Sequence, residues 1–264
     1  MGATGYTGGL VLDALLRRGL KPVVAGRNRD ALASIAERCG GLDYAIADVA
    51  DPAAVANLVQ RGDVLISTVG PFERFGYAVA RAAAESGAHY IDSTGEVGFV
   101  LELRRQLHDR RNATLVSGTE VLFLPLDFPT LDFVTVYNGW FPALSRPIAA
   151  MSGLTAGMTR IPLGRKLIDI ATRPMIGPPG GPDAAERSRT RTHVVAVATA
   201  NGVPPVEVHV EGPSAYTLTG ELMAWAAHQL TTTPPETAGV LGPVEAFGFD
   251  TLRAGCAEVG LLPV

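Results

Sequence analysis

The sequence predicts an α/β fold with a doubly wound parallel sheet. Three observations carry this prediction: a glycine-rich turn at residues 2–8, short apolar runs typical of buried strands, and amphipathic stretches of helical length between them. Strands that alternate with helices form parallel sheets covered on both faces, and right-handed crossovers favour the doubly wound arrangement. Ligands of such sheets bind beyond the carboxyl ends of the strands.

The elements follow one another in a regular order up to about residue 120. An amphipathic helix follows the glycine-rich turn and ends at Gly19. The next run is short and apolar and ends in glycine, which is typical of a buried parallel strand bounded by a turn. Asp30 is in position to cap the following helix, and Asp51 with Pro52 starts another. The expected strands are 21–26, 44–46, 64–68, 89–92 and 114–116, and the expected helices are 9–18, 31–38, one from Asp51, 75–86 and 98–110.

The regular order ends after residue 120. Residues 129–190 are rich in proline and glycine without a clear period, which is typical of loops. Two alternating apolar runs flank Asn201-Gly202 and predict a hairpin with a loop longer than two residues. The elements expected in this part are strands at 193–198 and 206–210 and helices at 217–230 and 243–259.

Composition excludes several classes of protein. The 264 residues carry a net charge of −4, whereas nucleic-acid binders need clustered Lys and Arg. Two cysteines are too few for a disulfide framework or a zinc site. Nothing resembles a signal peptide, so we expect a cytoplasmic location. The apolar stretch 147–158 is shorter than the roughly 20 residues that span a bilayer. No transmembrane segment is expected, while peripheral membrane contact and a homo-oligomer stay open.

The opening residues predict a site for a dinucleotide phosphate. Glycines spaced G-x-x-G-x-x-G let a phosphate approach the backbone without a Cβ in the way. The helix after this turn would point its first amides toward the pyrophosphate. An ordinary glycine-rich loop is the alternative. The strand that normally precedes such a turn either lies upstream of Met1 or is missing. The residues expected to bind the phosphates are Gly2, Thr4, Gly5, Tyr6, Thr7 and Gly8.

The end of the strand at 21–26 predicts NADP rather than NAD. NAD-binding folds usually place an acidic residue there to hold the ribose 2′-hydroxyl. This chain instead has Arg27, followed by Asn28 and Arg29. The guanidinium of Arg27 suits a 2′-phosphate, and Asn28 is assigned to the same site. The alternative for Arg27 is an exposed loop residue without a ligand.

Loops after the later strands are expected to complete a crevice for the cofactor. Asp48 could reach the adenine or cap the turn at 49–52. A Gly-Pro pair after the strand at 64–68 fixes the backbone beside the expected nicotinamide ribose. The cofactor residues assigned from these loops are Asp48, Ser67, Thr68, Val69, Gly70 and Pro71.

Residues 89–96 hold the candidates for proton transfer. Tyr90 and Glu96 are the expected catalytic residues, and His89 is a further candidate, because each places a polar group near the crevice. Alternation along a strand puts His89 and Tyr90 on opposite faces. The alternatives are that Tyr90 packs in the core and that Glu96 lies in the first turn of the next helix. No metal-ligand cluster, Ser-His-Asp set or phosphate-loop lysine is recognised.

A resemblance to a known family rests on four segments of the chain, which are 2–8, 25–27, 67–72 and 89–96. They resemble the saccharopine dehydrogenase-like oxidoreductases, a group that includes the trans-acting enoyl reductases of bacterial lipid synthesis. The resemblance covers residues 2–120 and resumes more loosely near 180–187 and 215–243. It implies a Rossmann-type NADP-binding domain at 1–120, a smaller, shortened and loop-rich α/β substrate domain with the hairpin at 121–212, and C-terminal helices at 213–264 that pack back on the Rossmann domain.

The sequence is interpreted as that of an NADPH-dependent oxidoreductase. Hydride would pass to a C=C, C=O or C=N bond of a small or lipid-like hydrophobic metabolite. Residues 130–180 are rich in apolar and small side chains, and enoyl reduction is slightly favoured. One alternative is an NADP-binding redox-sensing or regulatory module without turnover. Another is a truncated, inactive fragment of the family.

Overall fold

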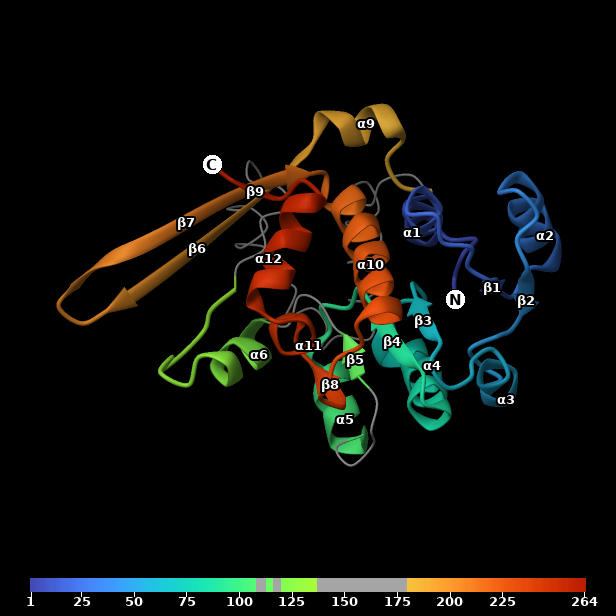
Figure 1. The fold of residues 1–264 in the computed structure, drawn as a ribbon, viewed down its shortest axis with the longest axis horizontal. Helices are drawn as coiled ribbons and strands as arrows, with labels where there is room; N and C mark the ends of the chain where they lie inside the picture. The colour runs from blue at the N-terminus through green and yellow to red at the C-terminus, as the bar shows by residue number, and fades with distance from the viewer. Residues whose placement is uncertain (108–112, 116–119, 137–179) are drawn as a thin grey trace, which may run out of the picture. The chain divides into compact units, whose positions relative to one another are not determined.

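The computed structural model describes residues 1–107, 113–115, 120–136 and 180–264 (Figure 1). The chain divides into two compact units, one of Met1–Phe133 with Asp183–Val264 and one of Val134–Pro182. Nearly all described residues belong to the first unit, which contains the helices and strands labelled in Figure 1. The apolar stretch 147–158 and most of the predicted loop-rich region 129–190 lie outside the described residues. The division at 120 and 212 stays a prediction.

Helices and short strands alternate along the first part of this unit, as predicted. The structure places strands within one or two residues of the expected positions, except that the first is limited to the end of the run at 21–26. The elements are α1 (Tyr6–Arg17), β1 (Val24–Gly26), α2 (Arg29–Arg38), β2 (Tyr44–Ile46), α3 (Pro52–Ala56), β3 (Val64–Ser67), α4 (Phe72–Ser86), β4 (His89–Asp92), α5 (Val97–Leu107), β5 (Ala113–Leu115) and α6 (Glu120–Asp127).

The second part of the unit contains the hairpin and the C-terminal helices. Its strand β8 was not predicted, because β8 is defined by its pairing with β5, which lies far away in the sequence. The elements are α9 (Ala184–Arg189), β6 (Arg191–Ala200), β7 (Val203–Pro213), α10 (Ala215–Thr232), β8 (Gly239–Leu241), α11 (Pro243–Phe247), α12 (Phe249–Glu258) and β9 (Leu262–Pro263).

The parallel strands form two separate sheets. One contains β1 and β2, and the other has the order β3-β4-β5-β8. All pairs in these two sheets are parallel, with Ser67 opposite Asp92 at the carboxyl ends of β3 and β4. The predicted α/β class with a parallel sheet is confirmed. The hairpin strands pair antiparallel in a third sheet of order β6-β7-β9.

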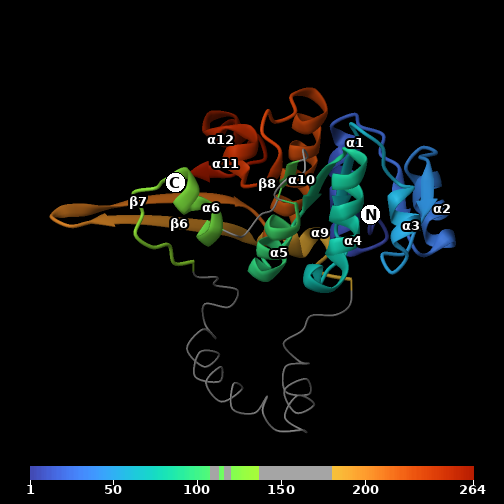
Figure 2. The same ribbon diagram turned by 90° about the horizontal axis from the view of Figure 1, so that it is seen from below.

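Helices cover both faces of the four-stranded sheet. Adjacent residues of β4 point into different layers: Tyr90 belongs to the core cluster with Phe99 of α5, and Ile91 belongs to the cluster with Trp225 of α10. Helices α1 and α10 lie side by side, whereas α4 and α5 lie against the other face (Figures 1 and 2). A Cβ at Gly220 would come within 3.1 Å of the Cβ of Leu10, so glycine permits this close helix contact. Among the described residues, no helix is long and apolar enough to cross a membrane.

Three local expectations were wrong. Asn28, rather than Asp30, caps α2: its side-chain oxygen accepts a hydrogen bond from the Ala31 amide at 3.1 Å, while Asp30 lies in the first turn. The hairpin loop has two residues, since Ala200 pairs directly with Val203. The expected helix 243–259 is divided into α11 and α12 at Gly248, whose φ of 75° is incompatible with a continuous helix.

Candidate cofactor site

The glycine-rich turn is held by close contacts that only glycine allows. Gly2 has a φ of 85°, and a Cβ there would lie 2.6 Å from Thr68 Oγ1. A Cβ at Gly8 would lie 2.1 Å from the carbonyl oxygen of Gly2. Helix α1 begins after Gly5 with no side-chain cap. The turn therefore presents backbone and a helix start that suit a phosphate.

Backbone hydrogen bonds anchor this turn between β1 and β3. The Met1 amino group donates to the Ile66 carbonyl oxygen at 2.7 Å, and the Thr68 amide donates to the Met1 carbonyl oxygen at 3.1 Å. On the other side, the Gly2 amide donates to the Ala25 carbonyl oxygen at 2.9 Å. Met1 and Gly2 thus bridge the two parallel sheets at the point where the sequence shows no complete strand.

The loop after β1 carries the residues predicted to select NADP. Arg27 is exposed and forms no ion pair with any residue that the structure describes. The side-chain oxygen of Asn28 caps α2, which leaves its amide nitrogen for a ligand. Asp48 accepts a hydrogen bond from the Ala50 amide at 2.9 Å. This bond agrees with the alternative that Asp48 caps the turn at 49–52. A contact of Asp48 with adenine stays a prediction.

The loop after β3 lies directly beside the glycine turn. Thr68 Oγ1 donates at 3.3 Å to the carbonyl oxygens of both Met1 and Gly2. Ser67 is buried, and the peptide bond between Gly70 and Pro71 is cis. The structure therefore brings Thr68 against Gly2, while cofactor contacts of Ser67, Thr68, Val69, Gly70 and Pro71 stay predictions.

Glu96 binds the start of helix α4. Its two carboxylate oxygens accept hydrogen bonds from the amides of Phe72 at 2.7 Å and Glu73 at 2.8 Å. The Thr94 hydroxyl in turn accepts a hydrogen bond from the Glu96 amide at 3.0 Å. A carboxylate at a helix N-terminus is electrostatically favourable. Glu96 therefore fixes the loop after β4 to the loop after β3.

Tyr90 and Asp92 form a buried polar pair beneath the loops. Tyr90 is 1% exposed, and neither its hydroxyl nor Asp92 Oδ2 has a hydrogen-bond partner among the described residues. Burial raises the pKa of Asp92 to about 7, and burial followed by the Asp92 charge raises the pKa of Tyr90 well above 10. A catalytic role for Tyr90 and Glu96 stays a prediction, since one is enclosed and the other caps a helix. Burial lowers the pKa of His89.

Sequence reasoning did not find two neighbours of Tyr6 in the glycine turn. Arg187 Nη1 of α9 donates to the Tyr6 hydroxyl at 3.0 Å, and the ring of Tyr216 lies edge-on to Tyr6 with centroids 5.1 Å apart. These residues come from distant parts of the chain, so no local pattern could join them. A basic residue beside the turn adds positive charge near the expected phosphates.

The geometry fits a dinucleotide with a 2′-phosphate. The turn contains Gly2 and Gly8, where a Cβ would collide, and helix α1 follows it without a side-chain cap. After β1 comes the exposed guanidinium of Arg27, which forms no ion pair among the described residues. Residues 1–117 match the Saccharopine dehydrogenase NADP binding domain. The match confirms the predicted resemblance and the NADP-binding class of the domain.

Two curated proteins are similar to this chain over part of its length. The human "Saccharopine dehydrogenase-like oxidoreductase" is 25% identical over an alignment of 173 residues, and the alignment covers 58% of this chain and 40% of the relative. The "Trans-acting enoyl reductase" of Mycobacterium ulcerans is 34% identical over an alignment of 104 residues, and the alignment covers 37% of this chain and 25% of the relative. This chain spans two fifths or less of both proteins.

A solved structure of apo saccharopine dehydrogenase from Saccharomyces cerevisiae is also similar in part. It shares 17% identity, covers 42% of this chain and 24% of its own, and has a TM-score of 0.36.

Proposed function

We propose that the chain is an NADPH-dependent oxidoreductase. The observation that carries this proposal is the exposed Arg27, without an ion pair among the described residues, at the end of a strand in an NADP-binding domain. NADPH would supply the hydride. The glycine turn would hold the pyrophosphate, and Arg27 would hold the 2′-phosphate through paired N–H groups.

The acceptor is proposed to be a C=C, C=O or C=N bond of a small or lipid-like hydrophobic metabolite, with an enoyl group first. Two features support this order: the name of the mycobacterial relative and the apolar, small side chains between residues 130 and 180. Most of those residues lie outside the described part of the chain. The cytoplasmic location stays a prediction.

Calorimetric binding of NADPH and NADH tests the cofactor. We expect NADPH to bind more tightly, and Arg27→Gln to weaken NADPH binding by about 10- to 100-fold, as expected for loss of charged hydrogen bonds worth about 1.5–3 kcal/mol. NADH binding should hardly change. Arg253→Gln, an exposed position on α12, is the matched control. Equal weakening of both cofactors, or no NADPH binding by the parent chain, would refute the assignment.

A second candidate is an NADP-binding module that regulates without turnover. The observation that favours it is the enclosure of Tyr90 and the use of both Glu96 oxygens in capping α4. NADPH oxidation measured across a panel of enoyl, carbonyl and imine compounds separates the two candidates. Tight binding of NADPH without consumption by any compound would support the module.

A further inference from the structure

Three segments that lie far apart in the sequence meet at the side chain of Tyr6. Tyr6 is the first residue of α1 and directly follows Gly5 of the glycine turn. Arg187 of α9 donates a hydrogen bond from Nη1 to the Tyr6 hydroxyl at 3.0 Å, and its guanidinium carbon lies 5.8 Å from the centre of the Tyr6 ring. Tyr216, in the first turn of α10, packs edge-on against the same ring. This corner therefore brings a cation from α9 to the helix start that follows the glycine turn.

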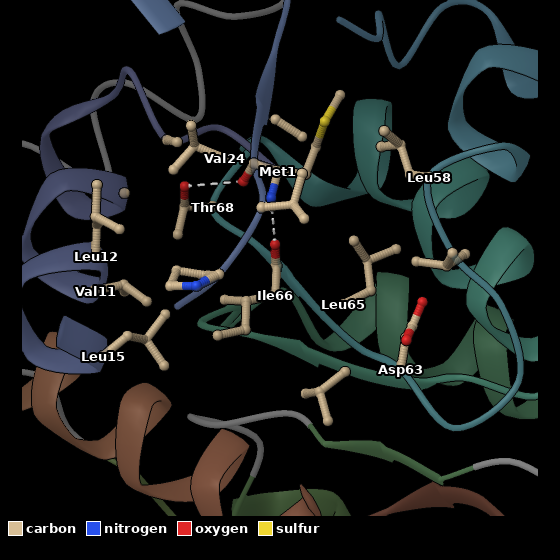
Figure 3. Close-up of a pocket in the computed structure, with 17 residues that line it drawn as sticks. Met1, Val11, Leu12, Leu15, Val24, Leu58, Asp63, Leu65, Ile66 and Thr68 are labelled. Carbon is tan, nitrogen blue, oxygen red and sulfur yellow. Dashed lines mark hydrogen bonds between the residues drawn. The ribbon is translucent and has the colours of Figure 1, made fainter. Parts of the chain in front are cut away.

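The glycine turn and α9 are each held by hydrogen bonds of their own. On the side of β3, the hydroxyl of Thr68 donates to the carbonyl oxygen of Met1 (Figure 3). In α9, Asp183 and Glu186 form a capping box, in which each side chain accepts from the backbone amide of the other residue at 2.8 and 2.9 Å. Arg187 is therefore carried by a capped helix to a turn that is anchored on its other side.

The charges at this corner suit an anion. The first turn of α1 contains no acidic residue, and its backbone amides carry the partial positive charge of a helix start. A guanidinium has five N–H donors, so the bond from Arg187 to Tyr6 is compatible with further bonds to phosphate oxygens. The Tyr6 hydroxyl accepts from Arg187 and has a proton of its own to donate. The pair can thus supply donors to an anion at the start of α1.

We propose that Arg187 binds the pyrophosphate of the cofactor together with the glycine turn, and that Tyr6 positions its guanidinium. This inference rests on the proposed function, since it adds one more group to the same cofactor. There, Arg27 binds the 2′-phosphate, which NADPH has and NADH lacks. Arg187 contacts the phosphates that both cofactors share, and so contributes affinity without selecting between them.

The position of Arg187 also connects cofactor binding to the hairpin. Helix α9 ends at Arg189, and β6 begins two residues later at Arg191. Arg191 in turn forms an ion pair with Glu211 of β7 at 2.6 Å, which joins the two strands at the base of the hairpin. A bond between Arg187 and the pyrophosphate therefore holds α9 and the segment that leads into the hairpin when the cofactor is bound.

Calorimetry with four ligands tests the contact. NADPH, NADH and ADP-ribose contain the pyrophosphate, whereas 2′-AMP contains the 2′-phosphate alone. We expect Arg187→Gln to weaken binding of the three pyrophosphate ligands by about 10-fold or more and to leave 2′-AMP binding unchanged within about twofold, because only the former accept the lost charged hydrogen bond. Arg189→Gln, at an exposed position on the same helix, is the matched control and should leave all four affinities unchanged.

Two further variants separate binding from packing. Arg187→Lys keeps a charge that can bind a phosphate and should recover most of the affinity that Arg187→Gln loses. Tyr6→Phe keeps the ring beside Tyr216 but loses the hydroxyl, and it should weaken the same three ligands by about 2- to 10-fold. Combined with Arg187→Gln, it should cause little further loss, because both changes remove one contact. Full additivity of the two losses would overturn the positioning role of Tyr6.

Amide exchange in the parent chain tests the contact even if a substituted chain folds poorly. NADPH should slow exchange of the Glu186 and Arg187 amides, which bond to Asp183, by about threefold or more, because a ligand bound to α9 stabilises the helix. NADPH binding without this slowing, or with unchanged affinity in Arg187→Gln, would overturn the role of Arg187 and leave the proposed function intact. Absence of NADPH and ADP-ribose binding by the parent chain would refute both.

Discussion

The four-stranded parallel sheet and the β6-β7 hairpin are rich in the same kinds of apolar residue but differ greatly in burial. In the parallel sheet, Leu65 is 6% exposed and Ile91 is 1% exposed. In the hairpin, Val197 is 55% exposed and Val206 is 61% exposed. Apolar residues therefore predict that a strand forms in both regions, but they do not identify what covers it.

The physical difference is the presence of helices on the faces. The parallel sheet is packed between α1 with α10 and α4 with α5. The hairpin is more buried only near its base, where Gly212 approaches Leu261 and β7 leads into α10. Figure 1 shows it as a long two-stranded ribbon. We expect the sheet to dominate stability and the outer hairpin to contribute little in the isolated chain.

Truncation of one residue in each region tests this contrast directly. Ile91→Ala should lower the free energy of unfolding by about 2–5 kcal/mol, because it leaves a cavity between the sheet and α10. Val206→Ala should change it by no more than about 0.5 kcal/mol, because the side chain is largely in solvent. Denaturant titration of both variants measures the two effects. A comparable loss in Val206→Ala would mean that the hairpin is covered in solution.

Short apolar strands with turn residues at both ends were the most predictable part of the fold. The apolar runs around Ile66 and Ile91 have turn residues on both sides, so their positions followed from local pattern. β8 and the contact of Arg187 with Tyr6 could not be predicted, because both depend on residues far apart in the chain. The cap by Asn28 was missed because Asp30 is equally suited to capping from composition alone.

Two adjacent glycines of the nucleotide-binding part, Gly8 and Gly9, differ in the space around them and give a second comparison of a crowded and an open position. Gly8→Ala should cost about 1–3 kcal/mol and weaken NADPH binding, because its Cβ would collide with the Gly2 carbonyl and displace the turn. Gly9→Ala meets no atom within 4 Å and should be neutral or stabilise α1 by about 0.5–1 kcal/mol. Thermal unfolding and NADPH calorimetry measure both. Unchanged NADPH affinity in Gly8→Ala would separate the turn from the cofactor site.

The positions of the cofactor loops could be predicted from the sequence, but the roles of individual side chains in them could not. The sequence located Glu96 and Asp48 near the crevice because both follow strands. It left open whether Asp48 caps the following turn, which its bond with the Ala50 amide now supports. It could not show that Glu96 accepts from the amides of Phe72 and Glu73, since those bonds depend on how the loops fold. A carboxylate near a crevice can therefore hold the loop, act on a ligand, or do both.

Replacing Glu96 distinguishes these tasks. Glu96→Gln keeps the shape but loses the charge and one of the two acceptors for the α4 amides. We expect a loss of about 0.5–2 kcal/mol in unfolding free energy, with NADPH affinity nearly unchanged. Glu207→Gln on the exposed hairpin should change neither, and it is the matched control. If Glu96→Gln instead preserved stability and abolished NADPH oxidation, Glu96 would act on the substrate rather than cap α4.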